Sequence, residues 1–81
     1  MNENYYAFCE WLQTTKALTK KSANDVVSRL KRAKNIIDVD VPVDIDALLF
    51  NFTRKTGFKA LTTTVRSQLK RAIKLYREFK P

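Results

Sequence analysis

The sequence predicts an all-α fold, a four-helix bundle of two helical hairpins, on three observations. Apolar residues recur every three or four positions over most of the chain, as in amphipathic helices. One Gly and two Pro leave few of the tight turns that a sheet needs. Residues 26–36 (VVSRLKRAKNI) and 65–75 (VRSQLKRAIKL) share Val, Ser, Leu, Lys, Arg and Ala at the same offsets, which indicates two related helices. Chance likeness between two amphipathic helices is the alternative explanation.

The length of 81 residues predicts one domain, residues 1–81, with a single core. A hydrophobic content of 44%, with nine aromatic side chains (five Phe, three Tyr, one Trp), is enough to build that core and argues against disorder. No apolar run approaches the roughly 20 residues that cross a bilayer, and no signal peptide is apparent. We therefore expect a cytoplasmic protein, in a bacterium or a phage-infected host, without a membrane partner.

The first hairpin is expected to join helices over residues 4–15 and about 20–37, with the turn at 16–21 (KALTKK). Thr19 or Ser22 is a suitable N-cap for the second of these helices, and the sequence does not decide between them. The apolar positions of the two helices are Tyr5, Phe8, Trp11 and Leu12, then Ala23, Val26, Val27, Leu30, Ala33 and Ile37. Tyr6 and Phe50 fall outside the apolar stripes, so we expect these two rings to be exposed.

The second hairpin is expected to follow an extended acidic linker over residues 38–44, because Pro42 disfavours a helix there. Asp44 is placed to cap a helix over residues 45–56, and Gly57 suits the left-handed residue that closes it. Thr62, Thr63 or Thr64 can cap the last helix, over residues 63–79. Its apolar positions are Val65, Leu69, Ala72, Ile73 and Tyr76.

The residue types present argue against catalysis and against a cofactor. The chain has no His, and its one cysteine, Cys9, lies in an apolar stripe where a small buried side chain is expected. Without His and with one Cys, the usual zinc sites are excluded. The acidic run DVDVPVD lacks the Gly and the distal Glu of a calcium loop, and a linker with a helix cap explains it better. We expect a non-enzyme.

The net charge of +8 is unevenly distributed along the chain. Four of the eight acids are Asp residues within positions 38–46, a stretch without Lys or Arg. Removing that stretch leaves 16 basic and 4 acidic residues, a charge of +12. Such a surface favours a polyanionic partner, and double-stranded DNA is the first hypothesis.

The basic residues of the two echoed helices are the predicted DNA contacts, because an α-helix fits the major groove and Lys and Arg reach the flanking phosphates. In the last helix, four of them lie at offsets of 0, 4, 8 and 11, and we call Arg66, Lys70, Lys74 and Arg77 the cationic ridge. The predicted contacts are Lys20, Lys21, Ser28, Arg29, Arg32, Arg66, Lys70, Arg71, Lys74 and Arg77. We expect both helices to present these residues side by side to one duplex.

The order of these segments resembles the N-terminal core-binding domain of tyrosine recombinases, the SAM-like domain of phage integrases. The resemblance rests on an aromatic first helix (YYAFCEWL), LTKKSANDVVSRLKRA, the helix IDALLFNF and LTTTVRSQLKRAIKLYREF. It covers nearly all of the chain as a pattern of residue types. It implies a domain that clamps one side of duplex DNA with its second and fourth helices. The catalytic domain of that family is absent, so the resemblance implies a fragment of a longer parent or a free-standing relative that cannot recombine DNA alone.

Two other kinds of partner remain open at this point. A small helical protein-interaction module, or a phage-encoded regulator, would use the same basic face against an acidic protein. Other copies of the chain, or a catalytic domain in a longer parent, are also conceivable partners. Binding to an anionic membrane is weaker as a hypothesis, because the apolar stripes are needed for the core.

Overall fold

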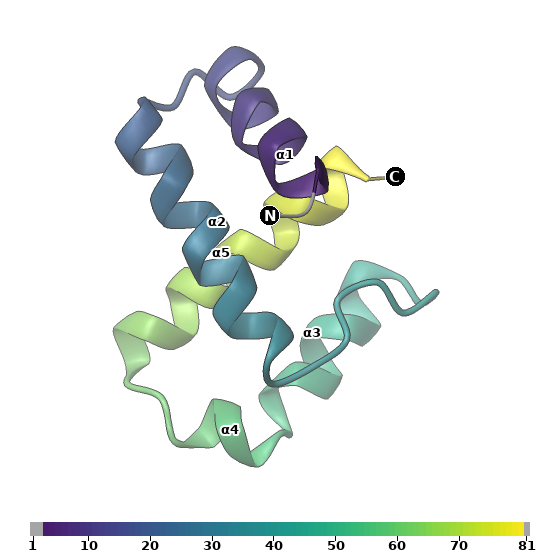
Figure 1. Cartoon of the computed structure of the whole chain (residues 1–81). Coiled ribbons are helices and arrows are strands. Elements are labelled where there is room, and N and C mark those ends of the chain that lie inside the picture. The colour runs from purple at the N-terminus through teal and green to yellow at the C-terminus, as the bar shows by residue number, and fades with distance from the viewer. Residues whose placement is uncertain (1–2, 81) are drawn as a thin grey trace.

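A computed structural model describes residues 3–80, which form five helices and no strand (Figure 1). The helices are α1 (Glu3–Thr14), α2 (Lys20–Lys34), α3 (Ile45–Thr53), α4 (Thr56–Lys59) and α5 (Thr63–Phe79). The prediction of an all-α fold is confirmed, but the predicted number of four helices was wrong. No helix in this part of the chain is both long and apolar enough to cross a membrane.

Two predicted helix ends were too late in the sequence. The second helix stops at Lys34 rather than at residue 37, because the chain tightens there: the amide of Ile36 bonds to the carbonyl of Ala33, three residues back. The third helix stops at Thr53 rather than at residue 56, where the amide of Arg54 bonds in the same way to Asn51. Apolar periodicity does not reveal such tight final turns.

The short helix α4 replaces the predicted left-handed turn at Gly57. Lys55 is extended, the chain re-enters a helix at Thr56, and no described glycine has a positive φ. The new turn buries Phe58, whose ring meets Phe52 edge to face with centroids 4.9 Å apart. A Cβ atom on Gly57 would lie 3.0 Å from Cγ1 of Ile36. The glycine therefore serves a close approach between segments and not a special backbone angle.

Three of the main helices begin where the sequence offered a capping side chain. Oγ1 of Thr19 accepts a hydrogen bond from the amide of Ser22 at 3.1 Å, which decides between the two candidate caps of α2. Asp44 caps α3 by accepting from Ala47 at 2.8 Å, and Thr62 caps α5 by accepting from Val65 at 3.3 Å. The predicted cap at Asp44 is confirmed.

One core joins all five helices, with Phe58 as the contribution of α4. Its completely buried large side chains are Phe8, Leu12, Val26, Leu30, Val39, Leu48, Phe52, Leu69 and Ile73. Val39 comes from the linker, which sequence periodicity did not identify as core. Tyr6 and Phe50 are 65% and 60% exposed, as predicted for these two rings. Cys9 is half-buried rather than buried, with its sulfur 3.3 Å from Oδ1 of Asn24.

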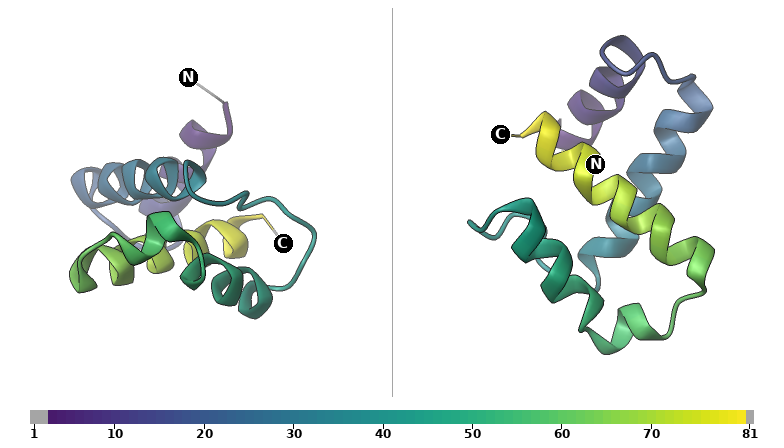
Figure 2. Two further views of the ribbon diagram at one scale, coloured as in Figure 1. Left: turned by 90° about the horizontal axis from the view of Figure 1, so that it is seen from below. Right: turned by 180° about the vertical axis from the view of Figure 1, so that it is seen from behind.

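The helices lie in two layers, and this arrangement decides which basic side chains share a surface. In Figure 1 α2 crosses in front of α5, and in the view from behind α5 crosses in front of α2 (Figure 2). Seen from below, α2 lies on one side of the molecule, while α3, α4 and α5 lie on the other (Figure 2). The outward sides of α2 and α5 therefore face opposite directions.

Candidate nucleic-acid interface

The outer face of α2 is the most continuous basic surface of the domain. The buried stripe of this helix is Ala23, Val26, Val27, Leu30 and Ala33, and all the remaining positions but Arg29 and Lys34 are exposed. We define the α2 face by the exposed side chains opposite this stripe, which are Lys20, Lys21, Asn24, Asp25, Ser28, Lys31 and Arg32, with the C-cap residue Asn35 at its end. From Lys21 to Arg32 it extends about 16 Å at 1.5 Å per residue. Asp25 is the one acidic residue within the helix.

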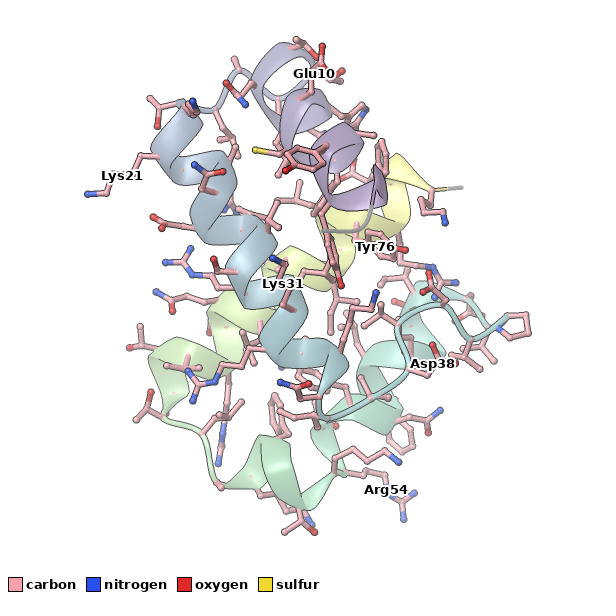
Figure 3. All side chains as sticks on the ribbon, in the orientation of Figure 1. Glu10, Lys21, Lys31, Asp38, Arg54 and Tyr76 are labelled. Carbon is pink, nitrogen blue, oxygen red and sulfur yellow. The ribbon has the colours of Figure 1, made fainter. Side chains whose placement is uncertain are left out.

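The start of α2 adds a favourable electrostatic field to this surface. Lys20 and Lys21 are its first two residues, and no acidic residue lies in the first turn. The partial positive charge of a helix N-terminus and two ammonium groups act in the same direction on an approaching phosphate. In Figure 3 Lys21 extends away from the domain into open space. This end of α2 can therefore meet a backbone phosphate without rearrangement.

A tyrosine from α1 positions the middle of the α2 face. The ammonium groups of Lys31 and Lys34 lie 4.9 Å and 5.0 Å from the ring centroid of Tyr5. Such cation–π contacts are worth about 0.5–1 kcal/mol at exposed sites and restrict the lysine side chain. Lys31 points forward from α2 in Figure 3 and was missing from the predicted contacts. Its seven-residue separation from Asn24 was the signal in the sequence that could have identified it.

Three of the four residues of the cationic ridge are occupied by contacts within the domain, two of them, Arg66 and Lys70, at α4. A terminal nitrogen of Arg66 donates to the carbonyl of Lys59 at 2.8 Å, and its guanidinium lies 5.2 Å from the Phe58 ring. Lys70 lies 5.5 Å from the same ring and is half-buried. Nε of Arg66 is buried without a hydrogen-bond partner among the described residues. Arg66 and Lys70 therefore hold α4 against α5. The sequence predicted that both side chains would point outward as part of the cationic ridge.

Arg77 holds the acidic linker against α5. Its guanidinium donates to three linker carbonyls, at 3.2 Å to Val39, at 3.4 Å to Val41 and in a third bond to Val43. The neighbouring Tyr76 hydroxyl donates to Oδ1 of Asp40 at 2.7 Å. Burial, and then this bond, raises the pKa of Tyr76 well above its ordinary value. Arg77 therefore stabilises the fold, because its guanidinium is bonded to the linker backbone.

Arg71 and Lys74 are the predicted contacts of α5 that remain exposed. By helical spacing they fall on the side of α5 away from its buried residues, and α5 lies in the layer opposite α2 (Figure 2). Because a straight duplex cannot lie along both sides of the domain, the predicted single surface divides in two. Lys20, Lys21, Ser28 and Arg32 share the α2 face, with the half-buried Arg29 at its flank.

A groove of about 860 Å³ lies between the linker, the start of α3 and the end of α5. Its apolar lining is Val41, Pro42, Ile45 and Leu49, and its charged lining is Asp40, Asp46, Lys74, Arg77, Glu78 and Lys80. Among residues 3–80 no group of three or more His, Cys, Asp or Glu side chains is placed to hold a metal ion. The groove is thus a mixed apolar and charged surface suited to a peptide side chain.

Compared with known proteins, the chain matches no family model, no curated protein and no solved structure. The class that the fold and this surface define is a small all-α domain with a basic helix face. The resemblance to the recombinase domain stays a prediction.

Proposed function

We propose that this chain is a duplex DNA-binding domain that contacts DNA through the α2 face. The observation that carries the proposal is the concentration of exposed Lys20, Lys21, Lys31 and Arg32 along about 18 Å of one helix, at 1.5 Å per residue. An α-helix of about 10–12 Å diameter fits a major groove about 12 Å wide. The lysines and arginine then meet phosphates on either side, while Asn24, Ser28 and Asn35 can reach base edges.

The binding is mainly electrostatic and weakly selective for sequence. Four exposed cations, with Arg29 at the flank, neutralise about four or five phosphates, which gives a slope of about −4 in log K against log salt concentration. Specific recognition would depend on a few polar side chains among many phosphate contacts. The recombinase-like resemblance fits this role for the second helix. For the last helix it fits less well, because Arg66 and Arg77 bind backbone carbonyls within the domain.

The test is a fluorescence-anisotropy titration of a labelled duplex with the wild type and two charge-reversal variants. Lys21→Glu with Arg32→Glu removes two phosphate contacts and should weaken binding at least about tenfold at about 50 mM salt, with a slope reduced to about −2. The control, Lys55→Glu with Lys59→Glu, makes the same change in net charge on exposed residues at α4. It should weaken binding less than about threefold.

Two results would contradict the proposal. One is the absence of wild-type binding at about 50 mM salt, where phosphate contacts are strongest. The other is an equal loss of affinity in the α2 variant and the α4 control, which would mean that net charge alone is responsible. Circular dichroism of each variant confirms that the comparison is between folded proteins.

A second candidate function, a protein-interaction module, is favoured by the groove beside the linker. Its apolar lining (Val41, Ile45, Leu49) suits a short apolar segment, and its charged lining, with three acids and three cations, suits a segment that carries charges of both signs. A protein partner that is retained after nuclease treatment and lost in Leu49→Glu would support this candidate. If nuclease treatment removes the partner, the interaction depends on nucleic acid, and DNA binding is the better explanation.

A further inference from the structure

We infer that the domain has a second DNA-binding face on α5 and that one molecule bridges two duplexes. This inference rests on the proposed function, because it assigns the same class of ligand to a second surface. It concerns the two predicted contacts that the layered fold separates from the α2 face, Arg71 and Lys74.

The second surface is a polar and basic stripe along the outward side of α5. We define the α5 face by its exposed residues Thr63, Thr64, Ser67, Arg71 and Lys74. No acidic residue occurs between positions 63 and 77. Beyond the stripe, Glu78 is paired with Lys16 at 3.0 Å, and Lys74 at the C-terminal end of the stripe shares the groove lining with Asp40 and Asp46. The stripe therefore presents two cations and three hydroxyl groups over about 16 Å of helix, the side-chain types that contact phosphates and sugars.

The internal echo gives the two faces matching chemistry. Ser28 and Arg32 on α2 correspond to Ser67 and Arg71 on α5, and all four side chains are exposed. Two apolar pairs of the echo correspond in burial as well, since Leu30 with Leu69 and Ala33 with Ala72 are buried, whereas Val26 is buried and Val65 is half-buried. A ligand that suits the hydroxyl and guanidinium of one face meets the same groups on the other.

The geometry allows both faces to be occupied at once. The domain measures 33 × 27 × 22 Å, and the two packed helices, each about 10–12 Å across, keep duplexes on opposite sides about 20 Å apart. The Debye length is about 8 Å at physiological salt, so repulsion between the two duplexes is largely screened at that separation. A single short duplex cannot occupy both faces, because DNA is stiff over about 150 bp.

The two faces differ in strength, which makes the inference measurable. The α2 face has four exposed cations and the α5 face has two, beside the half-buried Lys70. Each neutralised phosphate contributes about −0.9 to the slope of log K against log salt concentration. The second duplex should therefore bind with a slope of about −2, and the first with a slope of about −4. Bridging should therefore appear at higher DNA concentration than the first binding event.

The stoichiometry is measured by analytical ultracentrifugation of the protein with an excess of a duplex of about 14 bp, which is too short and stiff to bend around the domain. At about 50 mM salt we expect a species with one protein and two duplexes. Saturation at one protein per duplex overturns the inference while leaving the proposed function intact. A complex of two proteins and two duplexes also overturns it, because self-association would then explain bridging.

A separation of function comes from a bead assay, in which a biotinylated duplex captures a labelled second duplex through the protein. Arg71→Glu with Lys74→Glu should reduce capture of the second duplex at least about fivefold and change affinity for a single limiting duplex less than about threefold. Arg71→Gln with Lys74→Gln is the milder matched pair and should reduce capture in the same direction. Capture equal to wild type in both pairs overturns the inference. If the wild type does not bind a single duplex, the proposed function is overturned instead.

Discussion

The contact between Arg77 and the linker predicts a large loss of stability when its guanidinium is removed. In Arg77→Ala, the carbonyls of Val39, Val41 and Val43 lose a charged donor, and Val39 is completely buried. A hydrogen bond to a charged group contributes about 1.5–3 kcal/mol, and solvent can replace part of it at the two half-buried positions. We therefore expect the free energy of unfolding to fall by about 2–4 kcal/mol.

This loss is a large part of the total free energy of unfolding of a domain of this size. At about 0.05–0.15 kcal/mol per residue, a chain of this length is stable by about 4–12 kcal/mol. Arg77→Lys should keep about half of the stability that Arg77→Ala loses, because an ammonium group can approach one or two carbonyls but cannot reproduce the planar guanidinium fork. The matched control is Arg71→Ala on the same helix, where the side chain is exposed and the cost should be below about 0.5 kcal/mol.

Urea unfolding followed by circular dichroism measures these differences, and an unchanged m-value shows that the unfolding reaction is the same. Hydrogen exchange adds a local test, because the amide of Val43, bonded to Val41 at 2.8 Å, should exchange faster once the linker is released. If Arg77→Ala costs no more than Arg71→Ala, the guanidinium does not hold the linker. Its charge would then be free for a partner, as first predicted.

Two further predictions concern single contacts. Tyr76→Phe should cost about 0.5–1.5 kcal/mol at neutral pH through loss of the bond to Asp40. Because burial raises the pKa of Tyr76, its contribution is full below its ordinary value of about 10 and is lost as pH rises above that value. The free energy of unfolding should thus fall less between neutral and alkaline pH in Tyr76→Phe than in the wild type. An equal fall in both proteins would contradict this. Gly57→Ala should destabilise the domain by about 0.5–1 kcal/mol, because the added Cβ crowds Ile36. In an Ile36→Ala background the same change should stabilise the domain, because helix propensity then dominates. Stabilisation by Gly57→Ala alone would contradict the crowding.

Local signals in the sequence were sufficient to predict the helices and most of their starting points. The cap at Asp44, the exposure of Tyr6 and Phe50, and the bounds of α5 all depend on residues within one or two turns of each other. Periodicity and capping are local properties, so they can be evaluated from a short window. The same reasoning missed α4, because the burial of Phe58 against Phe52 depends on tertiary packing.

The errors at the candidate site have a different physical origin. Arg66 and Arg77 have the spacing of surface cations, but their partners are backbone carbonyls, and every residue type carries a carbonyl. A sequence therefore contains no compositional sign that an arginine will bind one. The partners of Arg77 lie 34 to 38 residues earlier in the chain, beyond any helix-period argument. Arginines near irregular linkers should be considered as backbone ligands before they are assigned to a partner.

The opposite directions of the two basic faces, in contrast, could have been inferred from the echo itself. When two helices carry the same apolar stripe and pack those stripes into one core, the polar sides at equivalent positions must point apart. Leu30 with Leu69 and Ala33 with Ala72 are buried in that shared core, and Arg32 and Arg71 are exposed on either side of it. A clamp on one duplex would need the two stripes to be turned relative to each other. Equivalence in the sequence therefore argues for two surfaces, and it makes the number of duplexes bound per molecule the decisive measurement.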